Sequence, residues 1–146
     1  MAVEKTILHV EDDLHYQMLC KKIFEKLGFV YTGVPTAERA EEILNQEKID
    51  ILLVDCFLHS EGINGDKLIE NLLNTNKFQN PIIYVSNSAR PAFIKKLKKD
   101  YPSAKITECV KQDFLPMLNQ LSQTNEQPSP DYLFEFLDTA YSTEHS

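Results

Sequence analysis

The chain has 146 residues, a formal net charge of −7 and ordinary shares of apolar and charged residues. This length suits one globular domain that folds without a disulfide or a structural metal. The acidic surface argues against direct binding to nucleic acid, because it would repel the phosphates. No apolar run reaches the roughly 20 residues of a membrane span, and the first residues lack the apolar core of a signal peptide, so we expect a cytoplasmic protein without membrane contact.

The three cysteines, Cys20, Cys56 and Cys109, are widely spaced and include no Cys-x-x-Cys pair. An odd number at such spacings argues against a disulfide framework or a zinc site. We therefore expect reduced thiols in the core of a cytosolic protein.

Short apolar runs alternate with longer amphipathic stretches in the first 122 residues. Strands are predicted at 6–10, 29–34, 49–54, 82–85 and 104–110. Helical spacing of apolar residues predicts helices at 13–27, after Thr36, around 68–73, from Pro91 onward and around 114–121. Five strand–helix units in a row indicate an α/β fold, with a parallel sheet and helices on both faces.

The last part of the chain departs from this alternation. Residues 123–130 are polar and contain two prolines, which suits a linker between a domain at 1–122 and a tail at 131–146. Apolar residues repeat at helical spacing between Tyr132 and Ala140 and predict a short tail helix. This helix could dock on a partner as an output element or simply cover core surface.

Polar residues stand at the predicted strand ends, where open α/β sheets bind their ligands. Each has an ordinary interpretation alone: acids favour helix N-termini, and lysines are usually solvated. Together they suit phosphoryl transfer to a carboxylate, in which clustered acids hold Mg²⁺, one acid is the nucleophile, a lysine attracts the phosphoryl oxygens and a hydroxyl donates to them. These residues are Glu11, Asp12, Asp55, Ser86 and Lys111.

The segments that carry these residues resemble the response regulator receiver domain family of two-component signalling. The matching segments are 7–13, 52–55, 81–86 and 110–111, and the resemblance covers about residues 4–122. It implies a five-stranded parallel sheet in the order 2-1-3-4-5, with helices on both faces as in flavodoxin-like folds.

The resemblance also implies a role for each site residue. Asp55 matches the phosphoacceptor, and Glu11 and Asp12 match the acidic pair that holds Mg²⁺ together with Asp55 and the backbone carbonyl of Phe57. Ser86 and Lys111 match the hydroxyl and the ammonium group that contact the phosphoryl group.

The partners implied by the resemblance are a donor and a target. The donor is a sensor histidine kinase or a histidine phosphotransfer protein of a phosphorelay, and the target is an unknown downstream protein. The chain would act as a monomer or a phosphorylation-dependent dimer. It would promote only its own phosphorylation and dephosphorylation, and would not otherwise be an enzyme.

Several positions depart from the family pattern. The loop after Asp55 is longer than usual, with His59 in place of a proline, and Asn87 follows Ser86 in place of a small residue. Glu108 stands where many members have a switch aromatic, so we expect coupling to run by another route. Gln112 replaces the proline after the site lysine, and since a cis bond before a non-proline residue costs about 2.5–4 kcal/mol, we expect a trans bond there.

These departures leave a second hypothesis open. The chain could be a phosphorylation-independent pseudo-receiver that acts as a protein-binding module, although the complete set of site residues opposes this. A flavin carrier or a phosphatase of similar fold is disfavoured, because acids 11–13 would repel a flavin phosphate and Phe57 stands where a phosphatase needs a second aspartate.

Overall fold

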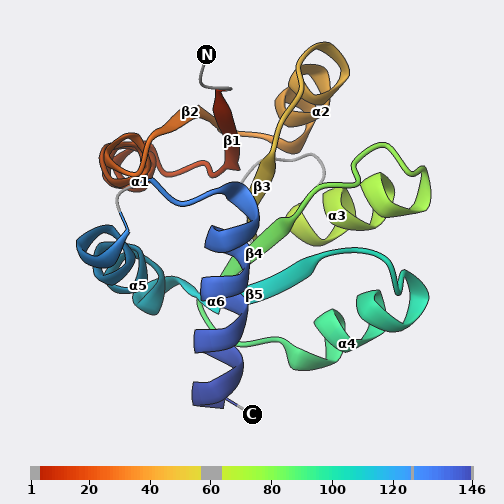
Figure 1. Ribbon diagram of the computed structural model, residues 1–146. Coiled ribbons are helices and arrows are strands. Elements are labelled where there is room, and N and C mark those ends of the chain that lie inside the picture. The colour runs from red at the N-terminus through yellow and green to blue at the C-terminus, as the bar shows by residue number, and fades with distance from the viewer. Residues whose placement is uncertain (1–3, 57–63, 126, 146) are drawn as a thin grey trace.

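The computed structural model describes residues 4–56, 64–125 and 127–145, with side chains up to residue 140. Strands and helices alternate to Thr124, and one further helix follows (Figure 1). The strands are β1 (Lys5–Val10), β2 (Phe29–Val34), β3 (Ile51–Asp55), β4 (Ile82–Ser86) and β5 (Ile106–Val110). The helices are α1 (Leu14–Lys26), α2 (Ala37–Gln46), α3 (Gly65–Asn74), α4 (Pro91–Asp100), α5 (Lys111–Thr124) and α6 (Pro130–His145).

The five strands form one parallel sheet in the order β2-β1-β3-β4-β5. The predicted fold class and strand order are therefore confirmed. The register places the ends of β1, β3 and β4 close together, because Val10 pairs with Val54 and Asp55 pairs with Val85. This edge of the sheet carries the polar residues singled out in the sequence.

Side-chain caps explain where most helices begin. Asp13 accepts the N–H groups of His15 and Tyr16 before α1, and Thr36 accepts the N–H of Arg39 before α2. Pro91 is the first residue of α4, as predicted. Gly65 is the first residue of α3, which therefore begins before the helix expected around 68–73.

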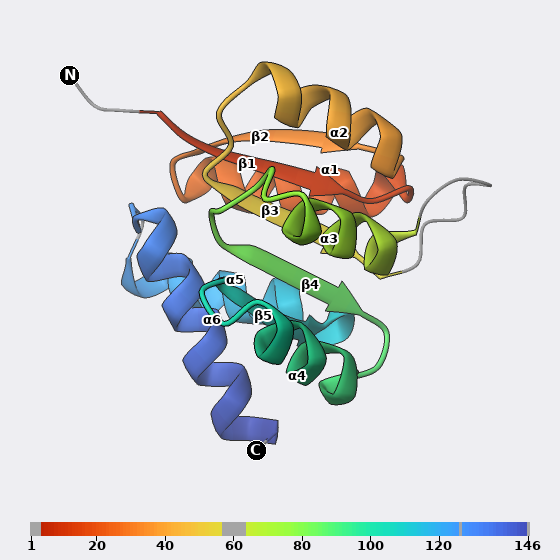
Figure 2. The ribbon, with the colours of Figure 1, turned by 90° about the vertical axis from the view of Figure 1, so that its right-hand side faces the viewer.

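The two faces of the sheet carry two separate hydrophobic clusters. Figure 2 shows α2, α3 and α4 on one side of the sheet, with α1 and α5 on the other. Phe24 and Phe114 belong to the cluster under α1 and α5, while Leu68 and Tyr84 belong to the cluster under α2, α3 and α4. The three cysteines are buried, as expected.

The predicted tail helix is confirmed as α6, and it packs on the core of the sheet. Leu133, Phe134 and Leu137 are buried in the cluster that also contains α5 residues. Figures 1 and 2 show α6 beside β5, at the end of the sheet, and the exposed pair Lys105–Asp131 joins the two elements at 3.4 Å. Since α5 continues to Thr124, helical structure extends two residues into the expected linker.

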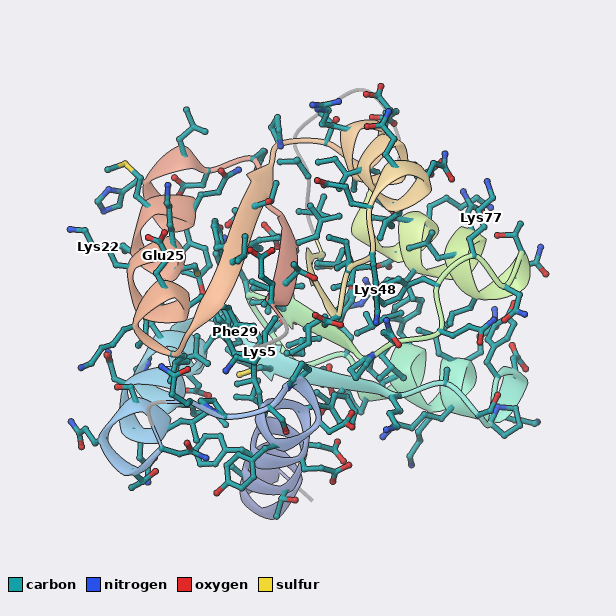
Figure 3. All side chains as sticks on the ribbon, turned by 45° about the horizontal axis from the view of Figure 1, so that its top comes forward. Lys5, Lys22, Glu25, Phe29, Lys48 and Lys77 are labelled. Carbon is teal, nitrogen blue, oxygen red and sulfur yellow. The ribbon has the colours of Figure 1, made fainter. Side chains whose placement is uncertain are left out.

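The segment before α6 is tied to the first strand. The Lys5 ammonium donates to the carbonyls of Leu27 at 3.2 Å and Pro128 at 2.7 Å, and it lies 4.7 Å from the centre of the Phe29 ring. Figure 3 shows Lys5 and Phe29 next to each other beside α6. These contacts fix where α6 begins. In the described part of the chain, no helix combines the length and apolar character needed to cross a bilayer.

Candidate functional site

The predicted site residues converge at the carboxyl ends of the strands. Glu11 directly follows β1, Asp55 ends β3, Ser86 ends β4, and Lys111 directly follows β5 as the first residue of α5. The backbone N–H of Glu11 donates to the Val34 carbonyl at 2.9 Å, which holds the segment after β1 against β2. The structure thus places these residues on one edge of the sheet, where the topology brings ligands.

Three carboxylates form the centre of this site. Glu11, Asp12 and Asp55 each offer an oxygen, and these oxygens lie within 4.8 Å of one another. Glu11 is fully buried and Asp55 is nearly so, whereas Asp12 is half-buried. Burial raises the pKa of the Glu11 carboxyl, the neighbouring Asp55 raises it further, and Lys111 opposes the increase. The cluster is therefore a place where a cation or a proton is favoured.

Lys111 supplies the positive charge of the site. Its ammonium is hydrogen-bonded to Glu11 and lies 3.4 Å from Oδ2 of Asp55. Burial lowers the pKa of Lys111, but the hydrogen bond to Glu11 and the charge of Asp55 outweigh it, so the net shift is upward. The ammonium also lies 4.4 Å from the centre of the Tyr16 ring, within cation–π distance. Lys111 is thus held charged among the carboxylates.

Neutral aromatic residues lie beneath the site. Burial lowers the pKa of His9 to about 3, and the charge of Lys111 contributes, so the imidazole is neutral near pH 7. His9 Nδ1 is 2.5 Å from the Tyr31 hydroxyl, and its ring meets the Tyr16 ring edge to face at 6.0 Å. A neutral His9 adds no repulsion toward the nearby ammonium.

Ser86 directs its hydroxyl along its own loop. The Ser86 hydroxyl donates to the Ser88 backbone carbonyl at 2.6 Å, and the residue is buried. A Ser86 hydroxyl that donated to a phosphoryl group on Asp55 would have to give up this bond.

The proposed Phe57 ligand and the Lys111–Gln112 peptide bond were two further expectations about the site. The carbonyl of Phe57 and the longer loop with His59 lie outside the described residues. Among the described residues no peptide bond is cis, so the bond between Lys111 and Gln112 is trans, as expected.

Sequence reasoning missed two residues that support the acidic cluster. Tyr16 faces the ammonium of Lys111, and the Gln17 side chain donates to the backbone carbonyl of Glu11. Both residues lie in the first turn of α1, directly after the N-cap Asp13. Helical side chains point back toward the N-terminus of their helix, so residues in this first turn can reach the strand end that precedes it. The N-cap Asp13, which is recognisable in the sequence, could therefore have located them.

The donor set fits magnesium. Mg²⁺ prefers oxygen ligands, and three carboxylates from two strand ends supply them. Glu11 Oε2 is buried and has no hydrogen-bond partner among the described residues, so this oxygen is available to a cation. Zinc or iron would favour nitrogen or sulfur ligands.

Comparison with known proteins identifies the family. The family model described as "Response regulator receiver domain" matches residues 7–113, well over half of the chain. The chain belongs to this family. A search of curated proteins found no match.

Solved receiver domains share the fold at low sequence identity. The signal receiver domain of a putative Luxo repressor protein from Vibrio parahaemolyticus is 15% identical, with a TM-score of 0.68 over 99% of this chain and 99% of that chain. The chemotaxis protein CheY4 of Vibrio cholerae is 15% identical, with a TM-score of 0.67 over 84% of this chain and 98% of that chain.

A third solved structure has a metal in its site. The receiver domain of a sensor histidine kinase from Pseudomonas aeruginosa is 21% identical, with a TM-score of 0.61 over 84% of this chain and 97% of that chain. A magnesium ion is coordinated in its active site cleft. These likenesses show the fold, and the family match confirms the resemblance found in the sequence.

Proposed function

We propose that this chain is a response regulator that accepts a phosphoryl group on Asp55 with magnesium and changes conformation to control a partner protein. One observation carries the proposal. Three carboxylates lie within 4.8 Å of one another, and the Lys111 ammonium contacts two of them. Such a site can bring a metal, a nucleophile and a phosphoryl group together.

Magnesium would be held by Glu11, Asp12 and Asp55, with the backbone carbonyl of Phe57 as a further proposed ligand. When bound, the ion supplies charge neutralisation that lets an anionic phosphoryl donor approach the carboxylates. Lys111 is already placed beside Asp55, where its ammonium can pair with a phosphoryl oxygen.

The proposed step transfers a phosphoryl group from a phosphohistidine of a sensor histidine kinase or a histidine phosphotransfer protein. The phosphorus–nitrogen bond breaks, its electron pair stays on the donor imidazole, and a bond forms between phosphorus and a carboxylate oxygen of Asp55. Ser86 then donates its hydroxyl to the phosphoryl group in place of the Ser88 carbonyl. The displaced hydrogen bond gives the reaction a conformational consequence.

The test is the intact mass of the protein after incubation with acetyl phosphate, with and without Mg²⁺. We expect an adduct of one phosphoryl group that requires Mg²⁺, is absent in Asp55→Asn and persists in Asp100→Asn, a control at the exposed end of α4. An adduct that survives Asp55→Asn would contradict the assignment of the phosphoacceptor.

The second candidate is a phosphorylation-independent pseudo-receiver that binds a protein partner. The pairing of Lys111 with Glu11 favours it, because the ammonium neutralises part of the acidic cluster without a metal. A folded protein that forms no adduct with acetyl phosphate or with a phosphohistidine donor would support this candidate.

We also propose the division of the chain into a receiver domain at 1–122, a linker at 123–130 and a tail at 131–146. The burial of Leu133 and Leu137 supports a tail that adds to the receiver core.

A further inference from the structure

Glu108, which occupies the position of the family's switch aromatic, has a definite role in this structure. It lies on β5 directly opposite Tyr84 of β4. Its carboxylate accepts the backbone N–H of Arg90 at 2.9 Å, and Arg90 is the N-cap residue of α4. Among the described contacts, Arg90 makes no capping hydrogen bond with its own side chain. Glu108 therefore places a negative charge at the positive end of the α4 dipole.

The side chain of Arg90 reaches from α4 back to the site. Its Nη1 is paired with Asp66 in the first turn of α3, lies 2.9 Å from the Tyr84 hydroxyl, and lies 3.3 Å from Sγ of Cys56. Cys56 directly follows the proposed phosphoacceptor Asp55 in the sequence. We call Asp66, Tyr84, Arg90 and Glu108 the Arg90 cluster.

The protonation states of the cluster suit these contacts. Tyr84 is fully buried, and its hydroxyl donates to Asp66. Burial is the main cause that raises the pKa of Tyr84, and the hydrogen bond to Asp66 raises it further, so the hydroxyl stays neutral. The contacts with Cys56 and Asp66 raise the pKa of Arg90, which stays charged. The guanidinium also lies 5.2 Å from the centre of the Phe93 ring in α4. The cluster thus joins α3, β4, α4 and β5 by directional contacts.

The segment between β4 and α4 is fixed at both ends by these bonds. At one end, the Ser86 hydroxyl donates to the Ser88 carbonyl, and at the other, both the backbone and the side chain of Arg90 are held. A pocket of about 480 Å³ beside this segment is lined in part by Cys56, Ser86, Ser88 and Arg90. If Ser86 turned toward a phosphoryl group, the segment would have space to move, but it would pull on Arg90.

We propose that Arg90 is a positioning residue that holds the segment from Ser86 to Arg90 in its unphosphorylated arrangement, and that phosphorylation frees the start of α4 by breaking the Arg90 cluster. This inference rests on the proposed function and names the route by which the site signals. The cluster consists of a few discrete contacts that are either made or broken, which is the kind of element that a phosphoryl group can bias. In this chain the charged contacts of the Arg90 cluster would couple the site to α4, a role that the switch aromatic has in members with an aromatic residue at the position of Glu108.

The test measures amide hydrogen exchange at Ile94, whose N–H donates to the Arg90 carbonyl at 3.3 Å in the first turn of α4. Exchange is followed with and without excess acetyl phosphate and Mg²⁺. In the wild type we expect phosphorylation to speed exchange about fivefold or more, the usual lower size of a coupling between sites. In Arg90→Met the unphosphorylated protein should already exchange at the faster rate, and phosphorylation should add little.

The rate of phosphorylation gives a second readout. Removing contacts that exist only in the unphosphorylated state should raise the rate of adduct formation by about fivefold in Arg90→Met and in the milder Asp66→Asn. Arg39→Met is the matched control, because Arg39 forms an exposed pair with Glu42 in α2. We expect it to behave as the wild type in both measurements.

The two proposals fail in different ways. A wild-type protein that forms no adduct overturns the proposed function and the coupling with it. An adduct whose formation leaves Ile94 exchange unchanged, or an Arg90→Met variant with wild-type exchange and wild-type rate, overturns the role of the Arg90 cluster alone. If Arg90→Met does not fold, Asp66→Asn decides between the same outcomes.

Discussion

Gly65 begins α3 at a point where no side chain fits. A Cβ at this position would lie 2.0 Å from the backbone oxygen of Asp55 and 2.9 Å from its carbonyl carbon. Because both atoms belong to the backbone, neither a rotamer change nor a small shift relieves the contact. Gly65 therefore determines how closely α3 approaches the proposed phosphoacceptor.

We predict that Gly65→Ala lowers the free energy of unfolding by about 1–3 kcal/mol, the usual cost of an added methyl group in a packed site. It should also slow adduct formation with acetyl phosphate, since Asp55 would be displaced. Urea unfolding and intact mass measure the two effects. Lys67→Ala, at an exposed position of the same helix turn, should change neither. A Gly65→Ala protein of wild-type stability would show that the approach is looser than described.

The Tyr16 ring gives a second prediction at this scale. A cation–π contact contributes about 0.5–2 kcal/mol, so Tyr16→Leu should slow adduct formation by about two- to thirtyfold through a less well placed Lys111. Tyr16→Phe keeps the ring and should restore most of the rate. Equal rates in the two variants would show that the ring face does not position the ammonium.

Single residues also mark the limit of what the sequence could predict. Asp55 and Lys111 were identifiable because they end strands, and strand ends follow from apolar runs. The partners of Arg90 were not, because Asp66, Tyr84 and Glu108 lie on three elements and meet only in the folded chain. The apolar periodicity of one helix or strand does not show which side chains of neighbouring elements will contact that helix or strand.

At the level of elements, α6 is the part whose contribution can be measured most directly. Leu137 is fully buried against the α5 side of the core. We predict that Leu137→Ala lowers the free energy of unfolding by about 2–5 kcal/mol, as for other buried leucines. Tyr132→Ala, on the half-exposed side of α6, should cost much less. Denaturant unfolding would check both, and equal effects would mean that α6 is only loosely attached.

Element boundaries were predictable where a cap or a proline defines them and not elsewhere. Thr36 and Pro91 marked the starts of α2 and α4 correctly. The strand expected at 49–54 begins at Ile51, because the Asp50 side chain takes the place of a backbone carbonyl and accepts the N–H of Thr6, and the Ile49 carbonyl accepts a side-chain N–H of Asn80. Apolar character reports burial, but it does not report which backbone groups pair.

The buried face of α1 was also only partly predictable from the spacing of its apolar residues. Leu19 fits the helical spacing of apolar residues, yet it is 39% exposed, whereas Phe24 is fully buried. The stripe of Cys20, Ile23 and Phe24 faces the sheet, and Leu19 lies at its margin. Spacing alone gives the direction of a face only to within about one residue.

For the molecule as a whole, the acidic site predicts that magnesium stabilises the fold. A ligand that binds only the native state at 100 times its dissociation constant adds about 2.7 kcal/mol. Thermal unfolding should therefore shift upward with Mg²⁺ and return on chelation with EDTA. Asp12→Asn removes one proposed ligand and should reduce the shift at the same Mg²⁺ concentration. An unchanged shift in Asp12→Asn would place the bound ion elsewhere.

The global fold was the most predictable property, because five alternating units admit few arrangements once their crossovers are right-handed. The alternation gave the parallel sheet, and the family resemblance gave its strand order. The position of α6 beside β5 could not be predicted, since its apolar stripe would pack equally well on any exposed apolar surface. Tertiary contacts such as that of Lys5 with Pro128 decide its place.

The position of α6 has a consequence for how two copies of the chain could meet. β5 is an edge strand of the sheet, and an uncovered edge offers its backbone groups to a strand from another molecule. Because α6 lies against β5, strand addition there would require its displacement. Loss of α6 would therefore expose a template for aggregation, and chains lacking it should form sheet-rich aggregates sooner on heating than intact chains do.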